Sequence, residues 1–427
     1  METDSPAESL ARLRQRIAGI ERKWVGAAPR AHPSGAFSGV LEQARTPASH
    51  QAIEEILSGE VLENEAGACF HTARNYAFHR RHGNAEISAI AESHAGPLGI
   101  VRPPQHWAFL DTETTGLAGG TGTYAFLIGI GEVAASGFCV HQFFMRDFSE
   151  EPALLAAVEN FLARFDVLVT YNGKAFDAPL LETRYRMARR RVPHQRLEHL
   201  DLLHAARRLW KLRLKSCRLV ELETAVLGFE RQGDLPGELI PYYYFDFLRT
   251  HDALRLVPVF HHNRMDILTL GCLTALVLAA LGEPSRAPLA HPVDLYSLAA
   301  WVARIGKRES ALELYARALR AGLPQAVEER ALWEKAALHK RGRDYTAAVA
   351  LWQELDTPEA LEELAKYYEH RARDFSAALH AAREALMRTG SAEQAAQLRK
   401  REARLERRAV GQALLPVIRT QQPGGPA

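Results

Sequence analysis

The chain has 427 residues, and its 53 Lys and Arg against 51 Asp and Glu give a formal net charge of +2. This length predicts about two to three domains, and the near balance of charge excludes a chain that is basic throughout, so any nucleic-acid surface must be local. The four cysteines include no CxxC pair, which excludes a zinc ribbon or a disulfide framework and favours a reducing, cytoplasmic compartment.

Neither the N-terminal stretch nor the most apolar run of the chain fits the role of a membrane signal. The N-terminal stretch METDSPAESLARLRQRIAGIERKW has no apolar core of the signal-peptide type. The most apolar run, from Ile267 to Leu281, is shorter than the roughly 20 residues that cross a bilayer. We expect no membrane association and a buried helix in a soluble protein.

The predicted elements begin late in the chain. Residues 1–105 carry Pro and Gly breaks without a strong hydrophobic period, which predicts a partly irregular N-terminal extension. Three β-rich segments, 106–113, 123–133 and 137–145, then predict adjacent antiparallel strands. A helix over 150–165, a strand over 166–172 and a helix over 178–191 follow. This order predicts an α/β fold over residues 106–283, a mixed sheet flanked by helices of the ribonuclease H type.

A Pro-rich segment, 284–294, is predicted to be a linker to an all-α domain over 295–395. In that domain RESALELYARAL, DYTAAVALWQEL and DFSAALHAAREAL place Ala311, Ala348 and Ala378 at offsets of 37 and 30 residues. These offsets straddle the ~34-residue period of tetratricopeptide repeats, and a plain array of helical hairpins is the alternative. Residues 396–427 are basic and then loop-like, which predicts a frayed tail.

Two acids follow the first apolar run of WAFLDTETTGLAGGTGTYAFLIGIG. Asp111 and Glu113 are two residues apart, so on a strand their side chains project from the same face of the sheet. Converging carboxylates repel each other unless a cation lies between them, and Mg²⁺ favours such oxygen ligands. The pair therefore predicts a divalent-metal site.

Two more acids lie at the starts of predicted helices, Asp177 in YNGKAFDAPLL and Asp266 in FHHNRMDILTL. Four carboxylates beside an imidazole suit phosphoryl transfer with two Mg²⁺ or Mn²⁺ ions about 3.5–4 Å apart. The structural alternatives are that the first two acids cap a turn, that Asp177 caps its helix, and that Asp266 is a first-turn acid favoured by the helix dipole. Asp201 in HLDLLH is interpreted as an N-cap or a residue that supports the site.

The motifs resemble those of the DEDD superfamily of 3′-to-5′ exonucleases. DTETTGL is similar to its first motif, Asn172 with Phe176 and Asp177 to the second, and HHNRMD to the third. The runs GLAGGTGTYAFLIGIG and HLDLLHAARRLWKLRLKSCRLVELETAVLGFERQGDLPGELIP are similar to the YprB-like, ribonuclease-H-like branch, whose members also carry tetratricopeptide-type tails.

The resemblance covers about residues 50 to 385. It implies that the metal ligands are Asp111, Glu113, Asp177 and Asp266, and that substrate is contacted by Thr114, Gly116, Leu117, Asn172, Lys174 and Phe176. From the residues themselves, Asn172 is interpreted as fixing the loop that presents Asp177, and Lys174 either touches a phosphate or is solvated.

Two histidines are candidates for the general base. His261 precedes Asp266 by five residues, as in one subfamily, and His262 precedes it by four, where another subfamily has tyrosine. Positions four apart share a helix face, which favours His262. His261 is favoured instead if the helix begins only at about Asn263. The histidine that is not the base caps or packs against the helix.

Between Arg184 and Arg218, twelve Lys and Arg stand against the two acids Glu198 and Asp201. Such a run attracts a polyanion, and a solvated helical face is the alternative. Tyr185, Trp210 and PYYYFDF offer faces for base stacking or for core packing.

The leading hypothesis is a two-metal-ion 3′-to-5′ exonuclease acting on DNA or RNA, with a protein partner bound through the helical repeats. The alternatives are a non-catalytic nucleic-acid-binding adaptor that scaffolds partners, and a phosphodiesterase acting on a small nucleotide. Retention of all four acids argues against the adaptor, and the basic run favours a polymeric substrate.

Overall fold

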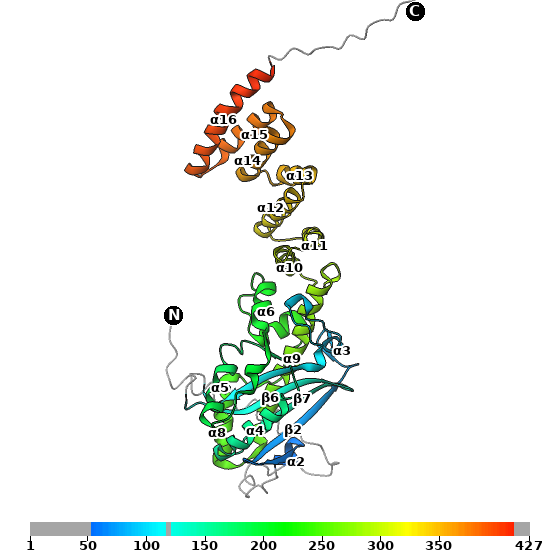
Figure 1. Cartoon of the computed structure of the whole chain (residues 1–427), viewed down its shortest axis with the longest axis vertical. Helices are drawn as coiled ribbons and strands as arrows, with labels where there is room; N and C mark the ends of the chain where they lie inside the picture. The colour runs from blue at the N-terminus through cyan, green and yellow to red at the C-terminus, as the bar shows by residue number, and fades with distance from the viewer. Residues whose placement is uncertain (1–52, 117–120, 414–427) are drawn as a thin grey trace, which may run out of the picture. The chain divides into compact units, whose positions relative to one another are not determined.

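The computed structural model describes residues 53–116 and 121–413. The chain divides into two compact units between Pro288 and Leu289, inside the segment expected to be a linker. The first unit is a mixed sheet with helices and the second is all helical (Figure 1), so the predicted fold class is confirmed.

The first unit is built on a seven-stranded sheet of order β1-β2-β7-β6-β5-β8-β9. The strands are β1 Glu60–Asn64, β2 Gly67–Ala77, β5 Trp107–Thr114, β6 Ala125–Ala134, β7 Gly137–Phe144, β8 Val167–Thr170 and β9 Glu198–Asp201. As expected, β5, β6 and β7 are antiparallel neighbours, whereas β8 pairs in parallel with β5 and with β9. Parallel pairing brings the carboxyl ends of β5, β8 and β9 to one edge of the sheet, where ligands bind in open α/β folds.

Two strands of the sheet, β1 and β2, lie within the extension that was expected to be partly irregular. β2 pairs with the whole of β7, from Phe70 opposite Phe144 to Ala77 opposite Gly137, and β1 lies outside it. The strand lacks a clear sequence period because buried Cys69 and Phe70 are adjacent, one on each face. Residues 1–52 lie outside the described ranges.

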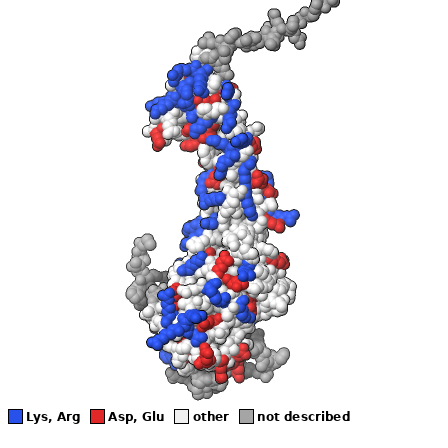
Figure 2. Space-filling view, viewed as in Figure 1, with Lys and Arg blue, Asp and Glu red and all other residues white. Residues whose placement is uncertain are grey.

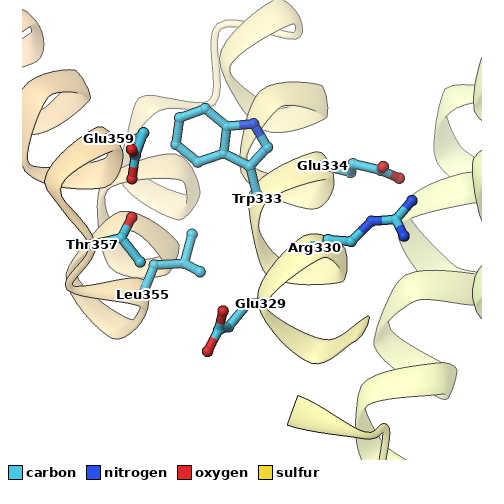
Figure 3. A pocket seen from close by; sticks show the side chains of 7 residues that line it. All are labelled: Glu329, Arg330, Trp333, Glu334, Leu355, Thr357 and Glu359. Carbon is cyan, nitrogen blue, oxygen red and sulfur yellow. The ribbon is translucent and has the colours of Figure 1, made fainter. Parts of the chain in front are cut away.

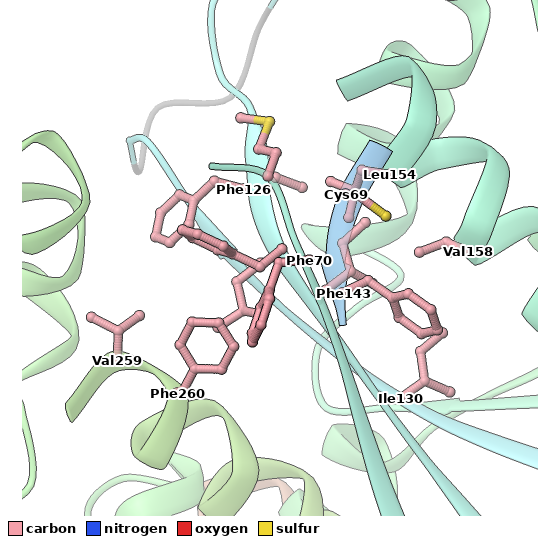
Figure 4. Close-up of a cluster of buried hydrophobic side chains, with 14 of the residues drawn as sticks. Cys69, Phe70, Phe126, Ile130, Phe143, Leu154, Val158, Val259 and Phe260 are labelled. Atoms are coloured by element: carbon pink, nitrogen blue, oxygen red, sulfur yellow. The ribbon is translucent and has the colours of Figure 1, made fainter. Parts of the chain in front are cut away.

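Helices cover both faces of the sheet. On one face α4 (Glu151–Leu162) packs through Leu154 and Val158. On the other, α9 (Val257–Gly282) packs through Val259 and Phe260 (Figure 4), beside α8 (Ile240–Thr250). Among the described helices, the one over Ala253–Gly282 is long and apolar enough to cross a membrane, but 78% of its most apolar window is buried. Such burial is that of a core helix, as expected for Ile267 to Leu281.

Two glycines allow α9 to approach the sheet. Gly129 and Gly131 lie two residues apart on β6. A Cβ on Gly129 would lie 2.2 Å from Oδ1 of Asn263, and a Cβ on Gly131 would lie 2.7 Å from Cγ2 of Ile267. Both distances are too short for real atoms, so glycine at these positions sets how closely the helix packs.

Shorter elements connect these layers. They are the hairpin of β3 Arg81–His82 and β4 Ala85–Glu86, and the helices α2 Ile53–Leu57, α3 Ser88–Ala91, α5 Asp177–Met187, α6 Leu202–Trp210 and α7 Leu219–Leu222.

The second unit consists of helical hairpins. Its helices are α10 Pro292–Arg304, α11 Arg308–Arg320, α12 Gln325–Arg341, α13 Tyr345–Leu355, α14 Pro358–Tyr367, α15 Phe375–Arg388 and α16 Ala392–Ala413. The aligned Ala311, Ala348 and Ala378 are fully buried, each at the fourth position of its helix. An all-helical region is therefore confirmed, and its assignment to tetratricopeptide repeats stays a prediction.

A groove of about 360 Å³ opens beside Trp333 of α12 (Figure 3). Its wall includes Glu329 and Glu334 from the same helix and Leu355, Thr357 and Glu359 around the turn from α13 to α14.

The end of the chain corrects the expectation of a frayed tail from residue 396. Helix α16 continues to Ala413, because Leu398 and Leu405 are buried and because Arg401 and Arg404 pair with the buried Glu369. Residues 414–427 lie outside the described ranges.

Candidate active site

Strand β5 carries the first pair of acids to the edge of the sheet. Asp111 and Glu113 alternate with Thr112 on this strand, so the expected shared face follows from the strand geometry. Glu113 is only 8% exposed, and its Oε1 is buried with no hydrogen-bond partner in the part of the chain that the structure describes. An ionised carboxylate in this position requires a hydrogen-bond partner that the described residues do not supply.

The third acid is presented by the loop between β8 and α5. Asp177 is the first residue of α5, and its Oδ1 accepts a hydrogen bond of 2.6 Å from the hydroxyl of Thr112. Phe176, and not Asp177, occupies the N-cap position. Asp177 therefore does not cap its own helix, which was the structural alternative for this residue. Its carboxylate is instead hydrogen-bonded to Thr112 on β5.

Asp201 holds the backbone of this loop. Its Oδ1 accepts from the backbone N–H of Asn172 at 2.8 Å, and its Oδ2 accepts from that of Lys174 at 3.1 Å. It also caps α6 by accepting from the N–H of Leu203. Asn172 has a left-handed φ of 65°, which asparagine tolerates better than most residues. The backbone of the loop that presents Asp177 is therefore held by Asp201, and the role expected for Asn172 in fixing this loop stays a prediction.

The fourth acid, Asp266, lies within α9 rather than in its first turn, because the helix already begins at Val257. Its Oδ1 accepts a hydrogen bond of 2.5 Å from Nη2 of Arg231, and its Oδ2 lies 3.5 Å from Nε2 of His262. The helix-dipole alternative for Asp266 does not hold in this geometry, since that effect fades beyond the first turn.

Helix α9 also anchors Asp111. The fully buried Asn263 donates from Nδ2 to Oδ2 of Asp111 at 2.9 Å. The Asn263 Oδ1 accepts from Nε2 of Gln142 on β7 at 2.9 Å. These two hydrogen bonds of Asn263 fix one carboxylate oxygen of Asp111. A side chain at position 129 would collide with Asn263, so glycine is needed there.

The acids lie close enough to oppose one another's ionisation. Burial, together with the charges of Asp266, Glu113 and Asp177, raises the pKa of Asp111 well above its ordinary value. Burial raises the pKa of Glu113 to about 8, against the opposing effect of His262, and raises that of Asp177 to about 6. All four predicted acids therefore belong to one electrostatic cluster.

The structure places the two histidines differently. His262 lies on the same face of α9 as Asp266. Burial alone would lower the pKa of His262, but the charge of Asp266 and the hydrogen bond to Asp234 raise this pKa to about 10. Burial and the charge of Arg264 lower the pKa of His261 to about 4. Because α9 is continuous through both residues, the late helix start that would favour His261 is not present.

The donor set suits a hard divalent cation, but the described side chains do not form a finished metal cage. The orphaned Oε1 of Glu113 and the raised pKa of the clustered carboxyls are what a cation would relieve. No three His, Cys, Asp or Glu side chains in the ranges described converge closely enough to hold an ion. Asp111, Asp177 and Asp266 instead accept hydrogen bonds from Asn263, Thr112 and Arg231.

The expected substrate residues lie around this cluster. Thr114 donates to the carbonyl of Gly116, while Leu117 lies outside the described residues. Lys174 is exposed, and Phe176 has 61% of its surface exposed beside Asp177. The exposed ring of Phe176 is accessible for stacking against a nucleobase.

The basic run divides into two parts. Arg184 is buried against Glu151 and Arg190 pairs with Glu159, so these cations hold α5 and the residues just after it to α4. Around α6 the exposed members of the run are Arg207, Arg208, Lys211, Lys215 and Arg218. Figure 2 shows Lys and Arg interspersed with Asp and Glu on the visible face of this unit. With Arg186, Arg189, Arg191 and Arg196 also exposed, nine of the twelve cations of the run lie at the surface.

The aromatic residues divide in the same way. Tyr185 and Trp210 are fully buried, so core packing holds for them. In PYYYFDF, Tyr243 and Tyr244 are buried, whereas Tyr242 and Phe245 are about half exposed.

Three residues of the site were not found from the sequence. Glu223, Arg231 and Asp234 lie between the second and third motifs. Arg231 contacts Asp266, Asp234 contacts His262, and Glu223 contacts Arg231. In the sequence, Arg231 and Asp234 are visible only as two opposite charges three residues apart in RQGD, within a loop that contains Gly and Pro.

Comparison with known proteins agrees with this architecture. A model of the RNase H superfamily matches residues 108–278, the span from β5 to α9 that carries the acids. The uncharacterized protein YprB of Bacillus subtilis (strain 168) is 35% identical over 312 residues, which cover 70% of this chain and 74% of that protein. The fold implies a nucleic-acid substrate and nuclease chemistry, for which RNase H-like enzymes typically use divalent metals. The chain therefore carries an RNase H superfamily domain and belongs to the same family as YprB.

Proposed function

We propose that this protein is a cytoplasmic, metal-dependent nuclease of the DEDD type that removes nucleotides from the 3′ end of DNA or RNA. The observation that carries the proposal is the gathering of Asp111, Glu113, Asp177 and Asp266 with His262 in one buried electrostatic cluster. The resemblance of the three motifs to DEDD exonucleases supports the 3′-to-5′ direction.

Asp111, Glu113, Asp177 and Asp266 would hold two divalent ions, which would neutralise charge at the scissile phosphate and activate the attacking water. The protein's own part is to keep these acids in place through Asn263, Thr112 and Arg231. Three of the four carboxylates, those of Asp111, Asp177 and Asp266, are thereby fixed by neighbours that do not react.

His262 would receive the proton of the attacking water at Nε2, the ring atom that faces Asp266. A base must be neutral, and the pKa of about 10 keeps this imidazole protonated while the surrounding acids are ionised. Neutralising those acids removes the main cause of the raised pKa. Cation binding and the activity of His262 as a base are therefore linked.

Substrate would approach over the loop of Lys174 and Phe176. Lys174 would contact a phosphate and the exposed ring of Phe176 would stack on a base at the end of the strand. The exposed cations around α6 would extend this path along the backbone of a polymer. The second unit, with its helical hairpins, would bind a protein partner.

The test is cleavage of DNA and RNA oligonucleotides labelled at either end, with Mn²⁺, with Mg²⁺ and with EDTA. Metal-dependent shortening from the 3′ end is expected, and Asp111→Asn or Asp177→Asn should abolish it without unfolding the protein. Asp147→Asn is the matched control, because Asp147 is exposed and asparagine also caps a helix. Binding without cleavage would instead favour the adaptor.

A further inference from the structure

A second layer of buried charge lies behind the predicted acids. The side chain of Arg231 is only 3% exposed, and its guanidinium contacts three carboxylates. Nε donates to Oε2 of Glu223 at 2.5 Å, Nη1 to Oδ2 of Asp234 at 3.0 Å and Nη2 to Oδ1 of Asp266 at 2.5 Å. One arginine therefore joins the loop that carries Asp234 to the helix that carries Asp266.

Glu223 is the fixed end of this arrangement. It is fully buried, and its Oε1 lies 3.0 Å from Nε2 of His82 on β3. The same oxygen accepts from the hydroxyl of Thr269, one helical turn beyond the active-site segment of α9. Held from both sides, Glu223 gives Arg231 one orientation, and the planar guanidinium transmits that orientation to its other two partners.

Asp234 provides the link to His262. Its Oδ2 lies 2.9 Å from Nδ1 of His262, while Nε2 of the same ring faces Asp266 at 3.5 Å. A ring that donates from Nδ1 to a fixed carboxylate has its tautomer and its rotation set by that bond. With Nδ1 occupied in this way, Nε2 is the nitrogen left to face the acids.

We infer that Asp234 and Arg231 are positioning residues: Asp234 holds His262 with Nε2 toward the cluster, and Arg231, anchored on Glu223, holds Asp234 and Asp266 at a fixed separation. For its catalytic consequence this inference rests on the proposed nuclease function. Neither residue is expected to touch the substrate, so they act through His262 and Asp266 alone.

A purely structural role is the competing interpretation. The same bonds also fasten the loop between α7 and α8 onto α9, and loss of that fastening alone would lower stability. The two interpretations differ in whether loss of Asp234 matters once His262 is gone.

The kinetic test compares Asp234→Ala, His262→Ala and the double variant, with Asp234→Asn as the conservative substitution and Glu230→Ala as an exposed control from the same loop. Asp234→Ala should lower kcat by about 10–100-fold with little change in KM, the range found for residues that orient a ligand. The double variant should be no slower than His262→Ala, and Asp234→Asn should retain more activity, since its oxygen can still accept from Nδ1. Independent, multiplying losses in the double variant would overturn the inference.

A second measurement does not depend on cleavage. In protein labelled with ¹⁵N-histidine, the Nδ1 proton of His262 should exchange slowly in the wild type and in Glu230→Ala, and rapidly in Asp234→Ala. An unchanged Nδ1 signal in a folded Asp234→Ala protein would contradict the positioning role, even if the wild type proved to be a nuclease. Conversely, a wild type that cuts no oligonucleotide but shows this change would count against the proposed function and support the positioning of His262.

Discussion

At the scale of single residues, Glu113 couples the stability of the fold to pH. Its pKa is raised from 4.5 to about 8 in the folded protein, chiefly by burial. Because the folded state binds this proton more tightly than the unfolded chain, its contribution to stability is complete below pH 4.5 and is lost as the pH rises through about 8. In EDTA we expect the free energy of unfolding to fall between pH 5 and pH 8, and to fall less steeply in Glu113→Gln. Urea denaturation at several pH values measures this.

The same residue should respond to metal. At pH 8, Mn²⁺ should raise the melting temperature of the wild type, because a ligand that binds only the folded state stabilises it, and should raise that of Glu113→Gln less. The assignment of Glu113 to a metal site would be contradicted if the free energy of unfolding changed equally with pH in both proteins and Mn²⁺ raised both melting temperatures equally.

The two histidines give a matched pair of substitutions. His262→Ala should lower turnover by roughly 10²-fold or more, since general-base catalysis contributes that much. His261→Ala should retain most activity, because on a helix that begins at Val257 this residue does not share the face of Asp266. Single-turnover cleavage at saturating Mn²⁺ separates the two. A dead His261→Ala protein with an active His262→Ala protein would reverse the assignment.

At the scale of elements, the distance between α9 and the sheet decides whether the site exists. Gly129→Ala places a Cβ against Asn263, the residue that holds Asp111, and should destabilise the protein by about 1–3 kcal/mol, as overpacking of a core does. Gly282→Ala, at the exposed end of the same helix, has no atom within 4 Å and should be nearly neutral. Thermal unfolding compares them, and equal melting temperatures would show that the helix can move away at little cost.

Elements with a strong local pattern were predictable from the sequence. The β5–β6–β7 meander and the apolar α9 carry long hydrophobic runs. Asp111 and Glu113 lie in a short motif near the end of β5, and Asp266 lies in a short motif within α9. Strands β2 and β9 could not be predicted from the sequence. Their own side chains show no clear strand pattern, and pairing with β7 and β8 stabilises them as strands. Arg231 and Asp234 were missed for a similar reason. The contact of Asp234 with His262 spans 28 residues of chain, and no local period encodes such a contact.

At the scale of the whole molecule, the division between Pro288 and Leu289 separates the acids from the helical hairpins. A fragment ending at Pro288 should fold and cut a model oligonucleotide at a rate close to that of the full chain, because every candidate ligand lies before that point. Circular dichroism and the cleavage assay test this together. A folded fragment without activity would mean that the helical unit contributes to the substrate path, and loss of only a protein partner would support its role in recruitment.

The order of the acids along the chain has a consequence for synthesis on the ribosome. Asp111, Glu113 and Asp177 emerge first, but α9, with His262 and Asp266, is the last large helix of the first unit. Since domains fold as units while they emerge, a growing chain that stops before residue 266 can build strands but cannot assemble the cluster. An incomplete chain therefore lacks the four-acid cluster on which the proposed nuclease activity depends.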